Sequence, residues 1–254
     1  MRREIRKRWF LRLQTVFGAF FLLSVVWAGR LLWEQYRQEM QVQDLLAIHT
    51  AGRTEGEEAA AEEQTEELPR NLSEINRDYL GWLTVYGTDT ALPVVLGEDN
   101  AYYLDHDFYG KDSSYGCLFA DYRTQPEQDG NLLIYGHHMK NGSMFGSLER
   151  FKEKEFFREH GLVRWEQGED SAWYEIFAVL VIPGYEEDEE YFPVDSYINR
   201  IDGDKTEELT VGLESRALLW RGVELSESDR FLFLLTCDYT RTDGRLLLCG
   251  KKIR

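Results

Sequence analysis

Cysteine, proline and basic side chains are all scarce in this chain of 254 residues. Its three cysteines are an odd number, so at least one thiol stays unpaired, and no two have the spacing of zinc ligands. The sequence also lacks a Gly-rich phosphate loop and internal repeats. Lys and Arg total 29 against 46 Asp and Glu, a net charge of −17, and so acidic a chain is poorly suited to nucleic-acid phosphates. We therefore expect no metal, no cofactor and no nucleic-acid partner.

The chain contains enough hydrophobic residues to form a folded core. Hydrophobic residues make up 43% of the chain and aromatic residues 14%, which excludes a wholly disordered chain and a multi-span membrane protein. The charge is unevenly distributed, since residues 1–12 hold six basic side chains and one acid. This asymmetry predicts that the basic N-terminal residues and the acidic remainder lie in two different cellular compartments.

Residues 13–29 carry no charge, and Leu31, Leu32 and Trp33 extend the apolar run past Arg30. About 20 such residues span a membrane as a helix. With the basic cluster in front, the positive-inside rule places residues 1–12 in the cytoplasm, makes 13–33 a single-pass signal-anchor and puts the remainder outside the cell. A cleaved signal peptide is the main alternative, but Val26-Trp27-Ala28 is a poor cleavage site. A buried helix of a soluble protein fits the basic flank less well.

Residues 34–69 form the next region. It is polar at first, with helical apolar spacing, and then so rich in Glu that it cannot bury enough surface to fold alone. We interpret it as an acidic spacer, or at most a surface helix. The folded domain is expected over 70–254, after Pro69.

That domain is predicted to be mainly β. Short apolar runs recur between turn signals, and Pro93 suggests an edge position for the second run. Helical spacing is expected over 144–157 and 195–221. Many short strands with one long insertion indicate a closed β-barrel with added helices. The expected strands are 82–86, 92–96, 116–120, 131–135, 173–182, 231–237 and 246–251.

Cys237 is the candidate nucleophile, because it ends a very apolar strand and opens onto a polar loop. Cys117 and Cys249 lie inside apolar runs, as expected of small core residues. A disulfide between them is the alternative. A catalytic thiol works as thiolate and benefits from a base or a positive neighbour. His137 and His138 both follow a strand at a turn, and only one of two adjacent side chains can face Cys237.

A third candidate, Arg245, opens the last expected strand eight residues after Cys237. In a hairpin its guanidinium would lie near the thiol, where it could stabilise an oxyanion. Arg241, in the intervening loop, competes for this role. A solvated arginine at a strand end is the simpler interpretation of Arg245 taken alone.

Together these segments resemble a class B sortase. The resemblance rests on two motifs, NLLIYGHHMKNGSMFGSLERF around the histidines and FLFLLTCDYTRTDGRLLLCGKKI around the cysteine and arginine. Two further segments are also similar, YYLDHDFYGKDSSYGCLFADYR and RDYLGWLTVYGTDTALPVV. The similarity covers roughly residues 70–254. It implies an eight-stranded sortase barrel and a catalytic set of Cys237, His137 and Arg245, with His137 preferred over His138 because it directly follows the glycine.

The resemblance also implies a reaction and its partners. Cys237 would cleave a C-terminal sorting signal of a surface protein after Thr, forming a thioacyl-enzyme, and an amine of a peptidoglycan precursor or a pilin would resolve it. Six positions match substrate-binding residues by the same resemblance: Asn100, Leu104, Tyr191, Phe192, Thr236 and Asp238. The acidic run 186–190 departs from the family and is interpreted as a solvated face, with attraction of a basic substrate feature as the alternative.

Two other functions stay open at this point. A thiol endopeptidase would use the same residues but release its product to water. A tethered binding domain would keep the barrel without activity, although the intact cysteine, histidine and arginine argue against this.

Overall fold

The computed structural model describes residues 2–54 and 71–254. Two compact units divide the chain between Ala47 and Ile48. The first unit consists of α1 (Arg2–Thr54) up to that boundary, and the stretch Phe17–Ala51 is long and apolar enough to cross a membrane. The helix continues past the expected end of the anchor at residue 33, so 34–54 is helical. The Glu-rich part of the expected spacer, from residue 55 onward, lies outside the described residues.

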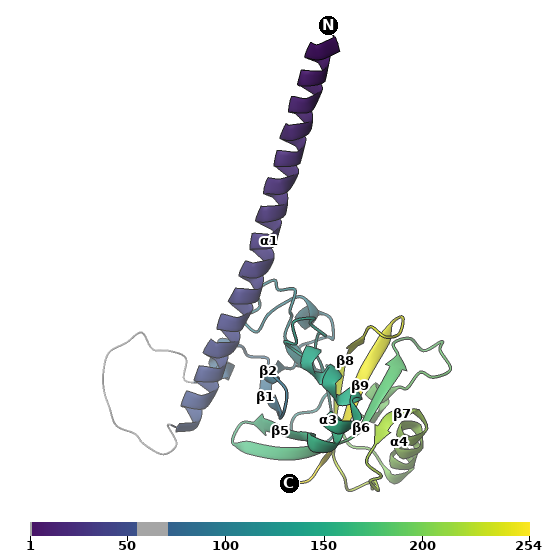
Figure 1. Cartoon of the computed structure of the whole chain (residues 1–254). Coiled ribbons are helices and arrows are strands. Elements are labelled where there is room, and N and C mark those ends of the chain that lie inside the picture. The colour runs from purple at the N-terminus through teal and green to yellow at the C-terminus, as the bar shows by residue number, and fades with distance from the viewer. Residues whose placement is uncertain (1, 55–70) are drawn as a thin grey trace, which may run out of the picture. The chain divides into compact units, whose positions relative to one another are not determined.

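The second unit is built around a closed β-barrel, as predicted (Figure 1). Eight strands form a ring in the order β5-β1-β2-β3-β4-β8-β9-β6, and pairing of β5 with β6 closes it. The ring strands are β1 (Tyr79–Val85), β2 (Ala91–Val95), β3 (Leu118–Ala120), β4 (Leu132–Tyr135), β5 (Leu162–Gln167), β6 (Asp170–Pro183), β8 (Phe231–Asp238) and β9 (Gly244–Lys252).

A ninth strand, β7 (Ala217–Trp220), pairs with β6 outside the ring. The helical elements are α2 (Leu72–Ile75), η1 (Tyr102–Leu104), η2 (Gly146–Lys152), α3 (Lys154–Glu159), η3 (Val194–Tyr197) and α4 (Gly203–Arg216). Both η3 and α4 belong to the insertion between β6 and β8, and Figure 1 shows α4 beside β7.

Three local expectations were wrong. The spacing over 195–221 predicts a helix, but α4 ends at Arg216 and the chain then becomes β7, because Ala217–Trp220 can complete the open edge of β6. The expected helix over 144–157 is split into η2 and α3, and Met144 precedes both with φ 53°, outside the helical region. β5 was missed altogether.

The strand of Pro93 is also not at an edge. β2 pairs with β1 on one side and with β3 on the other. Proline is tolerated because the ladder to β3 starts only at Val94, one residue later, so the missing N–H of Pro93 interrupts no bond on that side.

β8 is buried on both of its faces, which explains its continuous apolar sequence. Phe231, Phe233 and the partly buried Leu235 belong to a cluster under α4 and η3 that includes Leu209 and Leu213 of α4. The alternate residues Leu232 and Leu234 are fully buried on the opposite face, toward the barrel interior. An apolar strand buried on both sides is a rigid support for the residues at its end.

Candidate active site

The predicted nucleophile and arginine lie on adjacent strands, and the predicted base follows the end of the strand next to them. β8 and β9 are antiparallel, and Cys237 is the register partner of Arg245. β4 and β8 are parallel, with Tyr135 paired to Leu235. The backbone N–H of Gly136 still donates to the carbonyl of Leu235 at 3.2 Å, so continuing the register by two residues brings His137 level with Cys237.

The three side chains also share a face. Tyr135 and Leu235 pack against the cluster under α4, and residues two positions further along a strand point the same way. His137 and Cys237 therefore extend this face beyond the edge of the cluster, and Arg245 extends it on β9. We refer to His137, Cys237 and Arg245 as the catalytic row.

Cys237 differs from the other two cysteines in exposure. All three thiols are free, which excludes the Cys117–Cys249 disulfide in this structure. Cys237 is partly exposed, whereas Cys117 and Cys249 are buried and burial raises the pKa of both thiols. Only Cys237 combines an accessible thiol with a rigid strand end.

His137 is oriented by a backbone carbonyl. Its Nε2 lies 2.6 Å from the carbonyl oxygen of Leu104, at the end of η1. Because a carbonyl oxygen only accepts, Nε2 carries a proton, and Nδ1 is the nitrogen of the neutral ring that is free to take one. Gly116, with φ 60°, lets the backbone press against η1, since a Cβ there would lie 2.4 Å from the carbonyl oxygen of Tyr103.

His138 has both ring nitrogens occupied. Its Nδ1 donates to the backbone carbonyl of Cys237 at 2.9 Å, and its Nε2 lies 3.3 Å from a carboxylate oxygen of Glu149. Only 8% of the side chain is exposed. This ring holds the backbone of the thiol residue and has no nitrogen left to serve as a base.

The two arginines of the β8–β9 hairpin have different hydrogen-bond partners. Arg241 forms ion pairs with Asp188, at 2.6 Å, and with Glu190. Arg245 donates to the carbonyl of Gly244 at 2.9 Å, and Gly184 covers its guanidinium so closely that a Cβ would lie 2.8 Å from Cζ. Arg241 therefore holds the 184–190 segment, and Arg245 is the arginine that lies opposite Cys237 in the strand register.

Asp238, after the thiol residue, is a fully buried carboxylate. It accepts from Nζ of Lys152 at 2.7 Å and from the backbone N–H of Thr240 at 2.9 Å. Burial alone would raise the pKa of Asp238, but these donors outweigh burial and the pKa is lowered. The pair ties the end of β8 to η2.

The six positions matched to substrate binding lie in different environments. Leu104 is exposed, Tyr191 is partly exposed, and the amide of Asn100 is engaged by Asp121 and Tyr122. The other three side chains are buried. Phe192 stacks on Tyr197, Asp238 pairs with Lys152, and Thr236 has no hydrogen-bond partner for its hydroxyl among the described residues.

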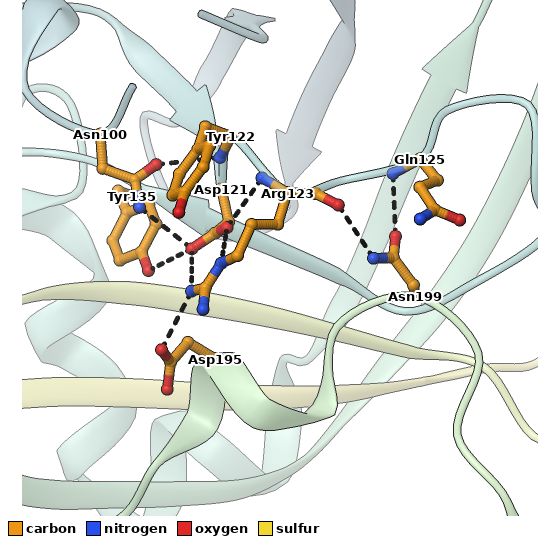
Figure 2. Close-up of polar contacts among 8 residues, drawn as sticks. All are labelled: Asn100, Asp121, Tyr122, Arg123, Gln125, Tyr135, Asp195 and Asn199. Carbon is orange, nitrogen blue, oxygen red and sulfur yellow. Dashed lines mark hydrogen bonds and ion pairs between the residues drawn. The ribbon is translucent and has the colours of Figure 1, made fainter. Parts of the chain in front are cut away.

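Sequence reasoning missed a polar network beside the row, shown in Figure 2. It is centred on Asp121 and includes Tyr135, whose hydroxyl donates to that carboxylate at 3.0 Å. Tyr135 is the last residue of β4, two positions before His137. The alternation of β4 was a signal that could have found it. In residues 2–54 and 71–254 the histidines, cysteines and carboxylates form no group suited to a metal ion.

Comparison with known proteins gives a consistent result. A family profile described as a sortase domain matches residues 83–253. Sortase B of Listeria monocytogenes is 32% identical, over 92% of this chain and 92% of its own length. The X-ray structure of sortase B from Clostridium perfringens is 32% identical, with a TM-score of 0.66 over 74% of this chain and 100% of that one.

Sortase B of Bacillus anthracis, solved in complex with a compound named AAEK1, is 27% identical, with a TM-score of 0.67 over 88% of this chain and 99% of that one. Sequence profile, relatives and barrel topology agree with one another on the family. The chain belongs to the sortases, a family of cysteine transpeptidases, and its relatives place it in class B.

Proposed function

We propose that this sortase cleaves a C-terminal sorting signal after Thr and transfers the protein to an amine, using the catalytic row. The observation that carries the proposal is the register of Cys237 with Arg245, together with the β4–β8 pairing that ends two residues before His137. The catalytic domain comprises residues 70–254.

In the first half-reaction the thiolate of Cys237 attacks the carbonyl carbon of Thr. The carbonyl oxygen becomes an oxyanion, and the guanidinium of Arg245, on the neighbouring strand, stabilises it. Collapse breaks the peptide bond, His137 gives a proton to the departing amine, and Thr remains bound to Cys237 as a thioester.

In the second half-reaction an amine attacks the thioester, and His137 accepts its proton. The new amide forms as the thiol leaves, which restores the enzyme. Orientation of His137 by the carbonyl of Leu104 supports this role, because Nε2 stays protonated while Nδ1 alternates between accepting and donating. Full engagement of His138 supports the assignment to His137 rather than His138.

The substrate groove is proposed to lie between two walls. Leu104, at the His137 end of the row, belongs to one wall, and Gly184 begins the other at the Arg245 end. Asn100 lies on the first wall and Tyr191 on the second. Phe192 contributes through packing, since its ring is buried. Thr236 and Asp238 support the thiol residue from within.

Membrane attachment is part of the proposal. The apolar stretch of α1 and the basic residues before it support a single-pass anchor with a cytoplasmic N-terminus and an extracellular catalytic domain. The amine is proposed to come from a peptidoglycan precursor or a pilin. A class B sortase of Streptococcus pyogenes that is 32% identical is described as involved in pilus biogenesis.

The test uses the full-length chain in detergent and a panel of fluorogenic pentapeptides of the types Asn-Pro-x-Thr-x and Ser/Pro-Pro-x-Thr-Gly. We expect at least one to be cleaved after Thr, a Thr-terminated acyl adduct on Cys237 by mass spectrometry, and transfer in place of hydrolysis when a glycine peptide or diaminopimelate is added. Cys237→Ala should abolish cleavage, and Cys117→Ala is the matched control. Cleavage by Cys237→Ala would overturn the nucleophile, and hydrolysis unaffected by any amine would favour the endopeptidase.

A further inference from the structure

Asp121, in the turn after β3, is a buried carboxylate that gathers donors from three parts of the chain (Figure 2). Its side chain is 0% exposed. Arg123 donates from Nε and Nη2, each at 2.8 Å, Asn100 donates its amide at 3.0 Å, and Tyr135 its hydroxyl at 3.0 Å. One carboxylate thereby links the loop before η1, the turn after β3 and strand β4.

Arg123 extends the network to the insertion between β6 and β8. Its Nη2 donates to Asp195 of η3 at 2.9 Å, so the guanidinium lies between two carboxylates. Asn199 makes a second connection, because its amide donates to the carbonyl of Arg123 at 2.9 Å and accepts from the N–H of Gln125 at 2.8 Å. The turn after β3 is therefore bonded both to the barrel, through Asp121, and to the insertion between β6 and β8, through Arg123.

The network reaches every border of the proposed groove. Asn100 is four residues before Leu104, which holds His137 on the first wall. Asp195 is four residues after Tyr191 on the second wall, and the charge of Asp195, after burial, contributes to raising the pKa of Tyr191. Tyr135 lies on β4 beside the catalytic row.

The second wall is held at its other end as well. Arg241 binds Asp188 and Glu190, and the N–H of Gly184 donates to the carbonyl of Asp243 at 2.8 Å. The segment 184–199 thus has one attachment to the β8–β9 hairpin and another to Arg123. Further bonds also hold it, since the carbonyl of Glu190 accepts from Nε of Arg216 at 3.2 Å and the backbones of Asn131 and Asn199 pair with each other. The ion pair of Asp195 with Arg123 is the attachment that joins this segment to Asp121.

We propose that Asp121, Arg123 and Asp195 form a brace that sets the distance between the two walls of the groove and thereby determines how tightly the sorting peptide binds. The three residues are positioning residues: they touch neither the thiol nor the histidine. This inference rests on the proposed function, since the width of the groove matters only if a peptide lies in it.

The side chains of the brace are suited to holding the two walls of the groove at a fixed distance. A guanidinium is planar and presents its donors in a fork, so Arg123 can bind Asp121 through two donors and still reach Asp195. Lysine has one compact ammonium and cannot make both contacts with the same geometry. A preformed groove also spares the peptide the ordering of a loosely held wall on binding.

The decisive variant is Asp195→Asn, which removes the charge at the second wall and leaves the buried Asp121–Arg123 pair intact. Glu175→Gln is the matched control, because Glu175 also pairs with an arginine, Arg221, but at the far end of β6 from Ile182, the partner of Arg245. Steady-state kinetics on the best pentapeptide of the panel, iodoacetamide labelling of Cys237 and hydrogen exchange of residues 184–199 are measured for both.

For Asp195→Asn we expect KM to rise about threefold to tenfold with kcat within about twofold, the pattern of lost uniform binding. The labelling rate of Cys237 should stay unchanged, and amides in 184–199 should exchange faster. Arg123→Lys should behave alike, and Glu175→Gln should match the wild type in every readout.

The two proposals fail differently. If the wild type and Glu175→Gln cleave the peptide with the same KM as Asp195→Asn, or if exchange in 184–199 is unchanged, the brace is refuted while the transpeptidase proposal stands. A fall in kcat together with slower labelling of Cys237 would also refute it, because the network would then act on the catalytic row. If the wild type cleaves no peptide of the panel, the proposed function itself fails, and the brace with it.

Discussion

Replacing Lys152 by methionine should destabilise the catalytic domain in a pH-dependent manner. Nζ of Lys152 lies 2.7 Å from a carboxylate oxygen of Asp238, whose side chain is 0% exposed, and only 17% of the lysine side chain is exposed. Methionine keeps most of the packing volume but removes the ammonium. Asp238 would then be a buried charge with only the donors of Thr240.

Removing one partner of a buried pair costs about 3 kcal/mol at neutral pH, at the lower end of the usual range because Lys152 is partly hydrated. For a domain of this size that lowers Tm by about 6–12 °C. Glu149, the second partner of Lys152, is half exposed and stays hydrated when the lysine is lost, so it adds little to the cost.

The pH dependence has opposite signs in the two proteins. In the wild type the pKa of Asp238 is lowered on folding, so its contribution to stability is complete above the unfolded pKa, about 3.9, and is lost as pH falls through the folded pKa. In Lys152→Met burial dominates and raises the pKa of Asp238 above the unfolded value. The variant is then penalised only where the carboxylate is ionised, and the difference in Tm should shrink between pH 7 and pH 4.

Tryptophan fluorescence during thermal unfolding of the full-length chain in detergent measures this difference at each pH. The double variant Lys152→Met/Asp238→Asn is the control and should recover much of the lost Tm at pH 7, because no buried charge remains. A Tm difference that is constant with pH, or that grows toward pH 4, would refute the role assigned to the pair.

The remaining predictions concern the catalytic row and use turnover of the best pentapeptide. His137→Ala should lower kcat/KM by about 10³-fold and His138→Ala by about tenfold, because only His137 has a nitrogen free for proton transfer; the reverse order would mean that His138 is the base. Arg245→Lys should cost about 10²-fold, since lysine lacks the planar fork, and activity near wild type would make Arg245 structural. Gly184→Ala should cost about tenfold with unchanged labelling of Cys237, because the new Cβ would lie 2.8 Å from Cζ of Arg245 and displace it; full activity would show that the guanidinium can move without consequence.

Much of the row could be predicted because its parts are local in sequence. Cys237 and Arg245 lie on one hairpin, and a hairpin brings residues eight apart into register by geometry alone. The choice between His137 and His138 was different. Periodicity showed that one of them faces Cys237, the family resemblance selected His137, and the structure adds that the ring of His138 is occupied on both nitrogens.

The less predictable features depend on distant partners. β5 and β7 are strands because β6 is long enough to pair with both of them along one edge. Their own short sequences do not indicate this pairing. Asp121 carries no signal in its own sequence, because the residues that converge on it, Asn100, Tyr135 and Arg123, come from three separate segments. Phe192 matched a substrate position by the family resemblance, and the structure shows in addition that its ring is buried and stacked on Tyr197.

The parallel pairing of β4 with β8 has a consequence for the timing of activity. His137 and Cys237 are one hundred positions apart in the chain, and the pairing of β4 with β8 brings their two segments together. Closing a loop of this length costs entropy that local contacts cannot offset in advance, so the pairing forms together with the barrel as a whole. We therefore expect acyl-transfer activity to appear only once the barrel has closed, because until then the proposed base and nucleophile are not held together.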